Sequence, residues 1–207
     1  MAHRHDVDRF NRWASDYDRH WMQRVIFEPV QETVLKLAAE QVPQPGAILD
    51  VGCGTGRLLG LTQRRFPEAK LVGVDAAIEM VRQAQTSSAD GAIRFQQAVA
   101  EELPFPNATF DLVFSTMTFH HWSDQGRGIA EVARVLKPGG RWLLAEFVAS
   151  GFVGFMRRVL RLHQFPERAE LQSRLLASGL HVVVEKRVRG LHGQVVVMAI
   201  APFVHSS

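Results

Sequence analysis

The sequence predicts a doubly wound α/β fold, in which helices cover both faces of a mostly parallel sheet. Between residues 46 and 147, short apolar runs alternate with stretches of helical periodicity, which is typical of a parallel sheet. Three closely spaced glycines follow the first apolar run, at the place where such sheets bind ligands. Two β-rich runs with a short link close the sequence and predict an antiparallel hairpin.

The expected elements follow in chain order. Residues 7–39 have helical spacing, with Phe10, Trp13 and Tyr17 on one face, and we expect them to form helices of a lid. The strands of the parallel part are expected at residues 47–51, 70–75, 92–97, 110–115 and 141–147. The helices between them are expected at residues 57–65, 78–85 and 124–136. A last helix at residues 167–178 precedes the two hairpin strands, at 180–188 and 194–203.

Chain length predicts a single domain, because 207 residues leave no room for two domains of ordinary size. We divide this domain into four parts. They are lid helices at 1–42, a ligand-binding core at 46–147, a cap insert at 148–166, and a terminal helix with the hairpin at 167–207.

Composition and charge exclude several classes of protein. Hydrophobic residues make up 46% and charged residues 22% of the chain, as in a packed protein and not a disordered one. The net charge of +3 is too small to indicate nucleic-acid binding. A single cysteine, Cys53, excludes an internal disulfide and a Cys-rich metal site. No apolar run reaches the roughly 18 residues of a membrane span, and the first residues lack the apolar core of a secretory signal. We therefore expect a cytoplasmic protein without stable membrane association.

The strongest signal is the segment ILDVGCGTGR at residues 48–57. It leaves a predicted strand and enters a helix. The glycines allow left-handed backbone conformations and let a ligand lie against bare backbone, while the start of the helix suits an anionic group. The dinucleotide fingerprint G-x-G-x-x-G would place its third glycine at position 57, which is Arg57. The spacing therefore speaks against a dinucleotide loop.

This loop resembles the nucleotide-binding loop of the class I S-adenosylmethionine-dependent methyltransferases. Similar segments follow in the family's order: VGVD at 72–75, AAIEM at 76–80, AEELPF at 100–105, FDLV at 110–113, FHHW at 119–122 and RVLKPGG at 134–140. Together they resemble the small-molecule branch, methyltransferase type 11, that includes ubiquinone and menaquinone C-methyltransferases. The resemblance implies a Rossmann-like seven-stranded sheet with an antiparallel terminal hairpin, a helical N-terminal lid, and S-adenosylmethionine as cofactor.

The resemblance also implies which residues bind the cofactor. Asp75 ends the second strand, where a carboxylate can accept both ribose hydroxyls, a feature shared with NAD sites. The implied cofactor-binding residues are Asp50, Gly52, Gly54, Gly56, Asp75, Ala76, Met80, Ala100, Glu101 and Ser115. There is one departure from the family. Val99 stands where relatives often have an aspartate that accepts the adenine amine.

Methyl transfer is an in-line displacement, so the protein mainly aligns the nucleophile and excludes water. A general base is needed only where the nucleophile must lose a proton. The candidates are His120 and His121, which follow the fourth strand, and Tyr17 in the lid. Each histidine is either a base or a structural residue, and Trp13 either lines the site or anchors the lid. Phe152 and Phe155 of the insert are expected to complete a mostly apolar acceptor pocket.

We therefore expect methyl transfer to an O, N or C nucleophile of a small molecule, by a monomer or homodimer. No metal is expected, because His3, His5 and His20 match no closed site. Two alternatives stay open. One is a non-catalytic S-adenosylmethionine-binding protein that acts in regulation or as a subunit. The other is a nicotinamide oxidoreductase, against which Arg57 and the terminal hairpin speak.

Overall fold

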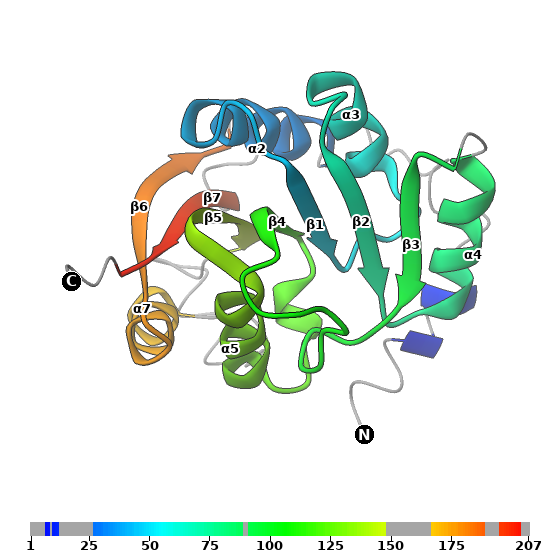
Figure 1. Ribbon diagram of the computed structural model, residues 1–207. Helices are drawn as coiled ribbons and strands as arrows, with labels where there is room; N and C mark the ends of the chain where they lie inside the picture. The colour runs from blue at the N-terminus through cyan, green and yellow to red at the C-terminus, as the bar shows by residue number, and fades with distance from the viewer. Residues whose placement is uncertain are drawn as a thin grey trace.

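The computed structural model describes residues 7, 8, 10–12, 27–88, 91–147, 167–188 and 195–203. Their central feature is a seven-stranded sheet in the order β3-β2-β1-β4-β5-β7-β6 (Figure 1). The strands are β1 (Ala47–Val51), β2 (Lys70–Asp75), β3 (Ile93–Gln97), β4 (Phe110–Thr116), β5 (Leu136–Phe147), β6 (Leu180–Arg187) and β7 (Val195–Pro202). The predicted insert at 148–166 lies outside the described residues.

The sheet is parallel from β1 to β5. Asp50, the next-to-last residue of β1, pairs with Gly73 of β2 on one side and Phe114 of β4 on the other. Strand β7 runs antiparallel to both β5 and β6, so β7 alone opposes the other six. The chain winds outward from β1 to β3 and then returns to begin β4 beside β1. This reversal places the ligand crevice of a doubly wound sheet at the carboxyl ends of β1 and β4.

Helices cover both faces of the sheet, as expected for a doubly wound fold. They are α2 (Glu28–Gln41), α3 (Arg57–Arg65), α4 (Ile78–Ser87), α5 (Gln125–Val135) and α7 (Arg168–Ala177), and the 3₁₀ turn η3 (Phe119–His121) follows β4. Alternate strand residues point to opposite faces. Phe114 and Leu143 therefore pack in the cluster under α2, α3 and α4, whereas Val113 and Trp142 pack in the cluster under α5 and α7. Both faces of the sheet are thus buried.

The predicted fold class is confirmed, and most element boundaries agree within two residues. The start of the fifth strand was wrong: β5 begins at Leu136 and not at residue 141. Leu136 pairs with Phe110, and a register shift follows before Leu112. Gly139, at φ +81°, lies within this irregular stretch. The sequence LKPGG resembles a turn locally, and only its pairing with β4 makes it strand.

The described residues include only part of the predicted lid. Residues 7, 8 and 10–12 are helical, and α2 accounts for the second half of the predicted helical region. Trp13 and Tyr17 lie outside the described residues. Within the described part of the chain, no helix is both long and apolar enough to cross a bilayer.

Candidate functional site

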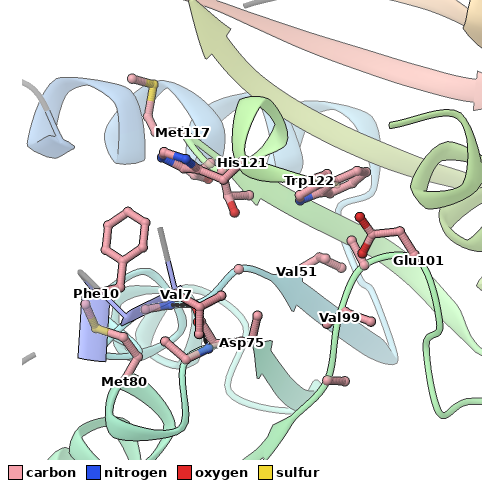
Figure 2. Close-up of a pocket in the computed structure, with 18 residues that line it drawn as sticks. Val7, Phe10, Val51, Asp75, Met80, Val99, Glu101, Met117, His121 and Trp122 are labelled. Carbon is pink, nitrogen blue, oxygen red and sulfur yellow. Dashed lines mark hydrogen bonds between the residues drawn. The ribbon is translucent and has the colours of Figure 1, made fainter. Parts of the chain in front are cut away.

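Two pockets meet at the glycine loop that follows β1. The larger encloses about 740 Å³, part of it open to solvent, and lies over the carboxyl ends of β1, β2 and β4 (Figure 2). The smaller encloses about 410 Å³ and lies toward α2 and α3. Gly52, Gly54 and Thr116 line both pockets.

Three glycines shape the loop for different reasons, although all have positive φ, at +77° for Gly52, +54° for Gly54 and +80° for Gly56. A Cβ on Gly52 would lie 2.1 Å from Thr118 Oγ1, and one on Gly56 would lie 2.6 Å from the Phe95 ring. Packing therefore requires both. A Cβ on Gly54 would meet no described atom within 4 Å. Gly54 thus presents bare backbone to the pocket space, as a ligand cradle requires.

Asp75 ties the glycine loop to the start of α4. Its Oδ2 accepts a hydrogen bond from Gly54 N (2.9 Å), and its Oδ1 accepts one from Ala77 N (2.8 Å). Burial raises the pKa of the Asp75 carboxyl, and these two N–H groups partly oppose that rise. Each oxygen keeps a further lone pair. The predicted acceptance of ribose hydroxyls stays compatible with these bonds and stays a prediction.

The walls of the larger pocket are mostly apolar. His121, Met117 and Trp122 lie on one side, with Phe10 and Met80 across the space from them (Figure 2). The other labelled lining residues are Val7, Val51, Asp75, Val99 and Glu101. Because apolar walls exclude water, this pocket favours a ligand with a large flat or hydrophobic part.

The exit from β4 separates the two predicted histidines. Met117 has φ +58°, an unusual conformation for a residue with a side chain, and turns the chain into η3. His121 lines the larger pocket, and the edge of its ring meets Phe10 at 5.1 Å between centroids. His120 does not line it and instead bonds Glu146 of β5 at 2.9 Å. Of the two candidate bases, His121 is the one at the pocket wall.

The smaller pocket has an unusual concentration of polar atoms. Gln31 Oε1, Asp50 Oδ1 and Thr116 Oγ1 are buried and have no hydrogen-bond partner among the described residues. Burial, reinforced by the nearby Asp75 charge, raises the pKa of Asp50 to about 8. Buried polar atoms are nearly always paired in folded proteins. Three unpaired oxygens in one small cavity therefore indicate a place for a ligand that donates hydrogen bonds.

Most of the predicted site residues converge on these two pockets. Those that line one or both are Asp50, Gly52, Gly54, Asp75, Ala76, Met80, Ala100, Glu101 and His121. Gly56 and His120 lie outside both linings, as described above. Ser115 is fully buried in the core, where its Oγ accepts a hydrogen bond from Trp142 Nε1 (3.1 Å). Its side chain therefore faces away from the predicted cofactor site. Tyr17, Phe152 and Phe155 lie outside the described residues.

Sequence reasoning missed several residues of the site. Gln31 follows Val30 on the buried face of α2. A polar residue next to this apolar face could have indicated a ligand-binding residue. Thr116 comes one residue beyond the predicted end of β4. The contact of Glu146 with His120 could not be predicted from the sequence, because a glutamate near the end of a strand is common. Within the described residues, no cluster of three or more His, Cys, Asp or Glu side chains is arranged to hold a metal.

Comparisons with known proteins agree with this geometry. Residues 49–144 match a family profile described as a methyltransferase domain. The demethylmenaquinone methyltransferase of Deinococcus radiodurans is 37% identical over 178 residues, which cover 84% of this chain and 68% of the relative. The malonyl-[acyl-carrier protein] O-methyltransferase of Geobacter sulfurreducens is 34% identical, covering 84% and 69%. An S-adenosylmethionine-dependent methyltransferase from Aquifex aeolicus shares the fold, with a TM-score of 0.73 at 22% identity over 94% of this chain and 98% of that one.

A doubly wound sheet with a glycine loop between two pockets at its switch point is typical of α/β proteins that bind nucleotides. Together with the sequence relatives, it shows that the chain belongs to the class I S-adenosylmethionine-dependent methyltransferases. The protein is accordingly an enzyme of methyl transfer, and neither alternative raised by the sequence is favoured.

Proposed function

We propose that the protein binds S-adenosylmethionine across both pockets and methylates a small, partly apolar acceptor that enters beside His121. The nucleoside lies in the larger pocket and the amino-acid end reaches the smaller one. The observation that carries this assignment is the set of unpartnered buried oxygens of Gln31, Asp50 and Thr116, directly beside the bare backbone of Gly54.

The smaller pocket fits the ammonium group of an amino acid. An ammonium carries three N–H donors and no acceptor, and this pocket offers three side-chain oxygens without partners. Asp50 can supply the opposite charge. With a pKa of about 8 its carboxyl is mostly protonated at neutral pH in the free protein, and a nearby cation favours the ionised form. The donor set of the ligand and the acceptor set of the pocket are therefore complementary.

The larger pocket fits a nucleoside. Asp75 stands at the end of β2 with lone pairs left for hydroxyl groups, and Met80 offers apolar surface to a flat ring. Ala100 and Glu101 belong to the same wall, although Glu101 Oε1 already accepts Asp124 N at 3.0 Å. These contacts support recognition of adenine by shape and by backbone groups more than by an acidic side chain.

Catalysis by this chain rests on alignment. When bound, S-adenosylmethionine supplies an electrophilic methyl group and a good leaving group. Phe10, Met117 and Trp122 exclude water and confine the acceptor beside it. His121 stands at the same wall, so it can take a proton from a nucleophile that must lose one. Acceptors that are already nucleophilic need positioning only.

The acceptor itself is proposed as a class. The two relatives are named for different acceptors, demethylmenaquinone and malonyl-[acyl-carrier protein]. The mostly apolar wall around Phe10 and His121 favours a small molecule with a hydrophobic portion over a polyanion. A cytoplasmic location, a monomeric or homodimeric state, and the roles of Tyr17, Phe152 and Phe155 stay predictions from the sequence.

Calorimetry tests the cofactor. S-adenosylhomocysteine should bind and NADH should not, and the reverse result would contradict the proposal. Gly54→Val should weaken S-adenosylhomocysteine binding by at least about a thousandfold, or ~4 kcal/mol, because the new side chain would fill the cradle. Gly91→Val is the matched control, since Gly91 also has positive φ (+65°) with free space around it and lines neither pocket. Turnover against a panel of quinols, phenols, amines and carboxylates then identifies the class of acceptor.

A further inference from the structure

A buried carboxylate stands behind the pocket wall. Glu146, next to last in β5, is fully buried. Its Oε1 accepts a hydrogen bond from Phe147 N (2.7 Å), and its Oε2 accepts one from His120 N (3.1 Å). Both oxygens also lie 2.9 Å from His120 Nδ1. Burying a carboxylate is costly unless it is paired, and here three N–H groups converge on it.

These contacts determine the protonation pattern of the His120 ring. Both oxygens of Glu146 accept backbone N–H groups, which favours an ionised carboxylate that also accepts from Nδ1, so that Nδ1 carries the shared proton. A neutral His120 ring then has its lone pair at Nε2. A carboxylate on one ring nitrogen fixes the tautomer and the orientation of a histidine in this way.

The sheet register brings Glu146 and His120 together. Thr116 at the end of β4 pairs with Ala145 of β5, and Met117 N donates to Ala145 O at 2.9 Å. The chain then turns sharply at Met117, so that η3 folds back over the next residue of β5, which is Glu146. Both the ring and the backbone N–H of His120 are held there, and the turn has little freedom to move.

His121 is the next residue, and its ring contacts the ring of His120. The rings of His120 and His121 lie 4.0 Å apart between centroids, inclined at 46°. His121 in turn forms part of the pocket wall and meets Phe10. A continuous series of contacts therefore runs from Glu146 through His120 to the wall where the acceptor is proposed to enter.

We propose that Glu146 is a positioning residue, which fixes His120 in the Nδ1–H form and through it holds His121 against the pocket. The inference deepens the proposed methyl transfer and rests on it for the role of His121. Glu146 itself touches neither pocket. The position of His121, and with it the alignment of the acceptor, thus depends on a side chain outside the site.

The test is nuclear magnetic resonance of the full-length protein labelled with nitrogen-15 in its nine histidines. Long-range nitrogen–proton spectra at about pH 8, where an ordinary imidazole is neutral, show which ring nitrogen carries the proton. His120→Gln identifies the His120 signals, and its amide can still donate to Glu146. We expect Nδ1 of His120 at the protonated shift and Nε2 at the unprotonated one. An unprotonated Nδ1 would overturn the proposal.

Glu146→Gln then tests the link to the pocket. We expect the His120 signals to leave the pure Nδ1–H pattern and the His121 signals to shift or broaden, with S-adenosylhomocysteine affinity within about threefold of wild type. Glu185→Gln is the control. Glu185 lies on the outer strand β6, where it pairs with Arg168 of α7, and it lines neither pocket. Histidine spectra unchanged by Glu146→Gln would refute the link. Should Glu146→Gln fail to fold, displacement of the His121 signals by His120→Gln decides the same question.

Failure of the proposed function has a different signature. Suppose that the wild-type protein shows the expected His120 tautomer, but that S-adenosylhomocysteine does not shift the His121 signals. The Glu146 contact would then be supported, and the assignment of the cofactor to this pocket would be contradicted.

Discussion

The two pockets share the glycine loop but treat their polar groups in opposite ways. In the larger pocket the carboxylates are occupied, Asp75 by Gly54 N and Ala77 N and Glu101 by Asp124 N. In the smaller pocket, Asp50 Oδ1 and Gln31 Oε1 have no partner among the described residues. The contrast teaches that carboxylates with hydrogen-bond partners hold the backbone of a site in place, whereas buried oxygens without partners indicate where a charged group of a ligand binds.

Among the carboxylates of the two pockets, the largest effect is expected at Asp75 in the larger pocket. Asp75→Ala frees the amides of Gly54 and Ala77 and removes the acceptor for ribose. We expect S-adenosylhomocysteine affinity to fall by on the order of 2–4 kcal/mol, given about 1.5–3 kcal/mol per charged hydrogen bond. Asp75→Asn keeps one acceptor oxygen and should lose less. Calorimetry measures both, and an unchanged dissociation constant for Asp75→Ala would remove it from the site.

Asp50→Asn tests the smaller pocket by its effect on the pH dependence of stability. Burial raises the folded-state pKa of Asp50 to about 8 from an ordinary value of 3.8. The stability gained from this proton is fully present below about pH 4 and is lost as the pH rises through the folded-state pKa. Asp50→Asn has no such proton to lose. Wild-type free energy of unfolding should therefore fall, relative to the variant, by on the order of 1–2 kcal/mol between about pH 6 and pH 7.5.

Urea unfolding of the ligand-free proteins at several pH values measures this difference. Parallel pH profiles would show that Asp50 titrates normally. Binding supplies a second measurement. If an ammonium group ionises Asp50, wild type should release a proton on binding S-adenosylhomocysteine near neutral pH, and Asp50→Asn should not. Calorimetry in two buffers of different ionisation enthalpy detects that proton.

The smallest effect is expected in the satisfied pocket, at Val99. Val99 is 37% exposed and lines the larger pocket. Val99→Asp should leave S-adenosylhomocysteine affinity equal or improve it by up to about 1 kcal/mol, the value of one added hydrogen bond. A large loss of affinity in a folded variant, measured by the same titration, would instead mean that Val99 packs against the adenine ring.

Local signals explain which parts of this structure could be predicted. The elements β1, α3 and β2 begin and end as expected, and glycines flank β1 at both ends, a glycine precedes α3 and an aspartate ends β2. The start of β5 could not be predicted, because Leu136 becomes strand only by pairing with Phe110. Element boundaries that depend on local residues can be predicted from a sequence. Boundaries that depend on pairing with a distant strand cannot.

The same distinction applies to the site. The sequence located the end of β4 to within one residue, but the side chains of neighbouring residues point to opposite faces, so Ser115 meets Trp142 in the core and Thr116 lines both pockets. Likewise His120 and His121 are equivalent in the sequence. Only the register of β4 with β5, which brings Glu146 to His120, separates their roles.

The segment around Phe10 has a consequence for α4. The N-cap of this helix, Ala77, has no side chain that can cap it. Asn11 Oδ1 accepts a hydrogen bond from Glu79 N at 3.1 Å in its place, while Phe10 packs against the cluster of Ala77 and Met80. Lifting this segment would uncap α4, at a cost of about 1 kcal/mol. The amide of Glu79 is therefore a natural reporter, by its rate of hydrogen exchange, of whether the edge of the pocket is closed.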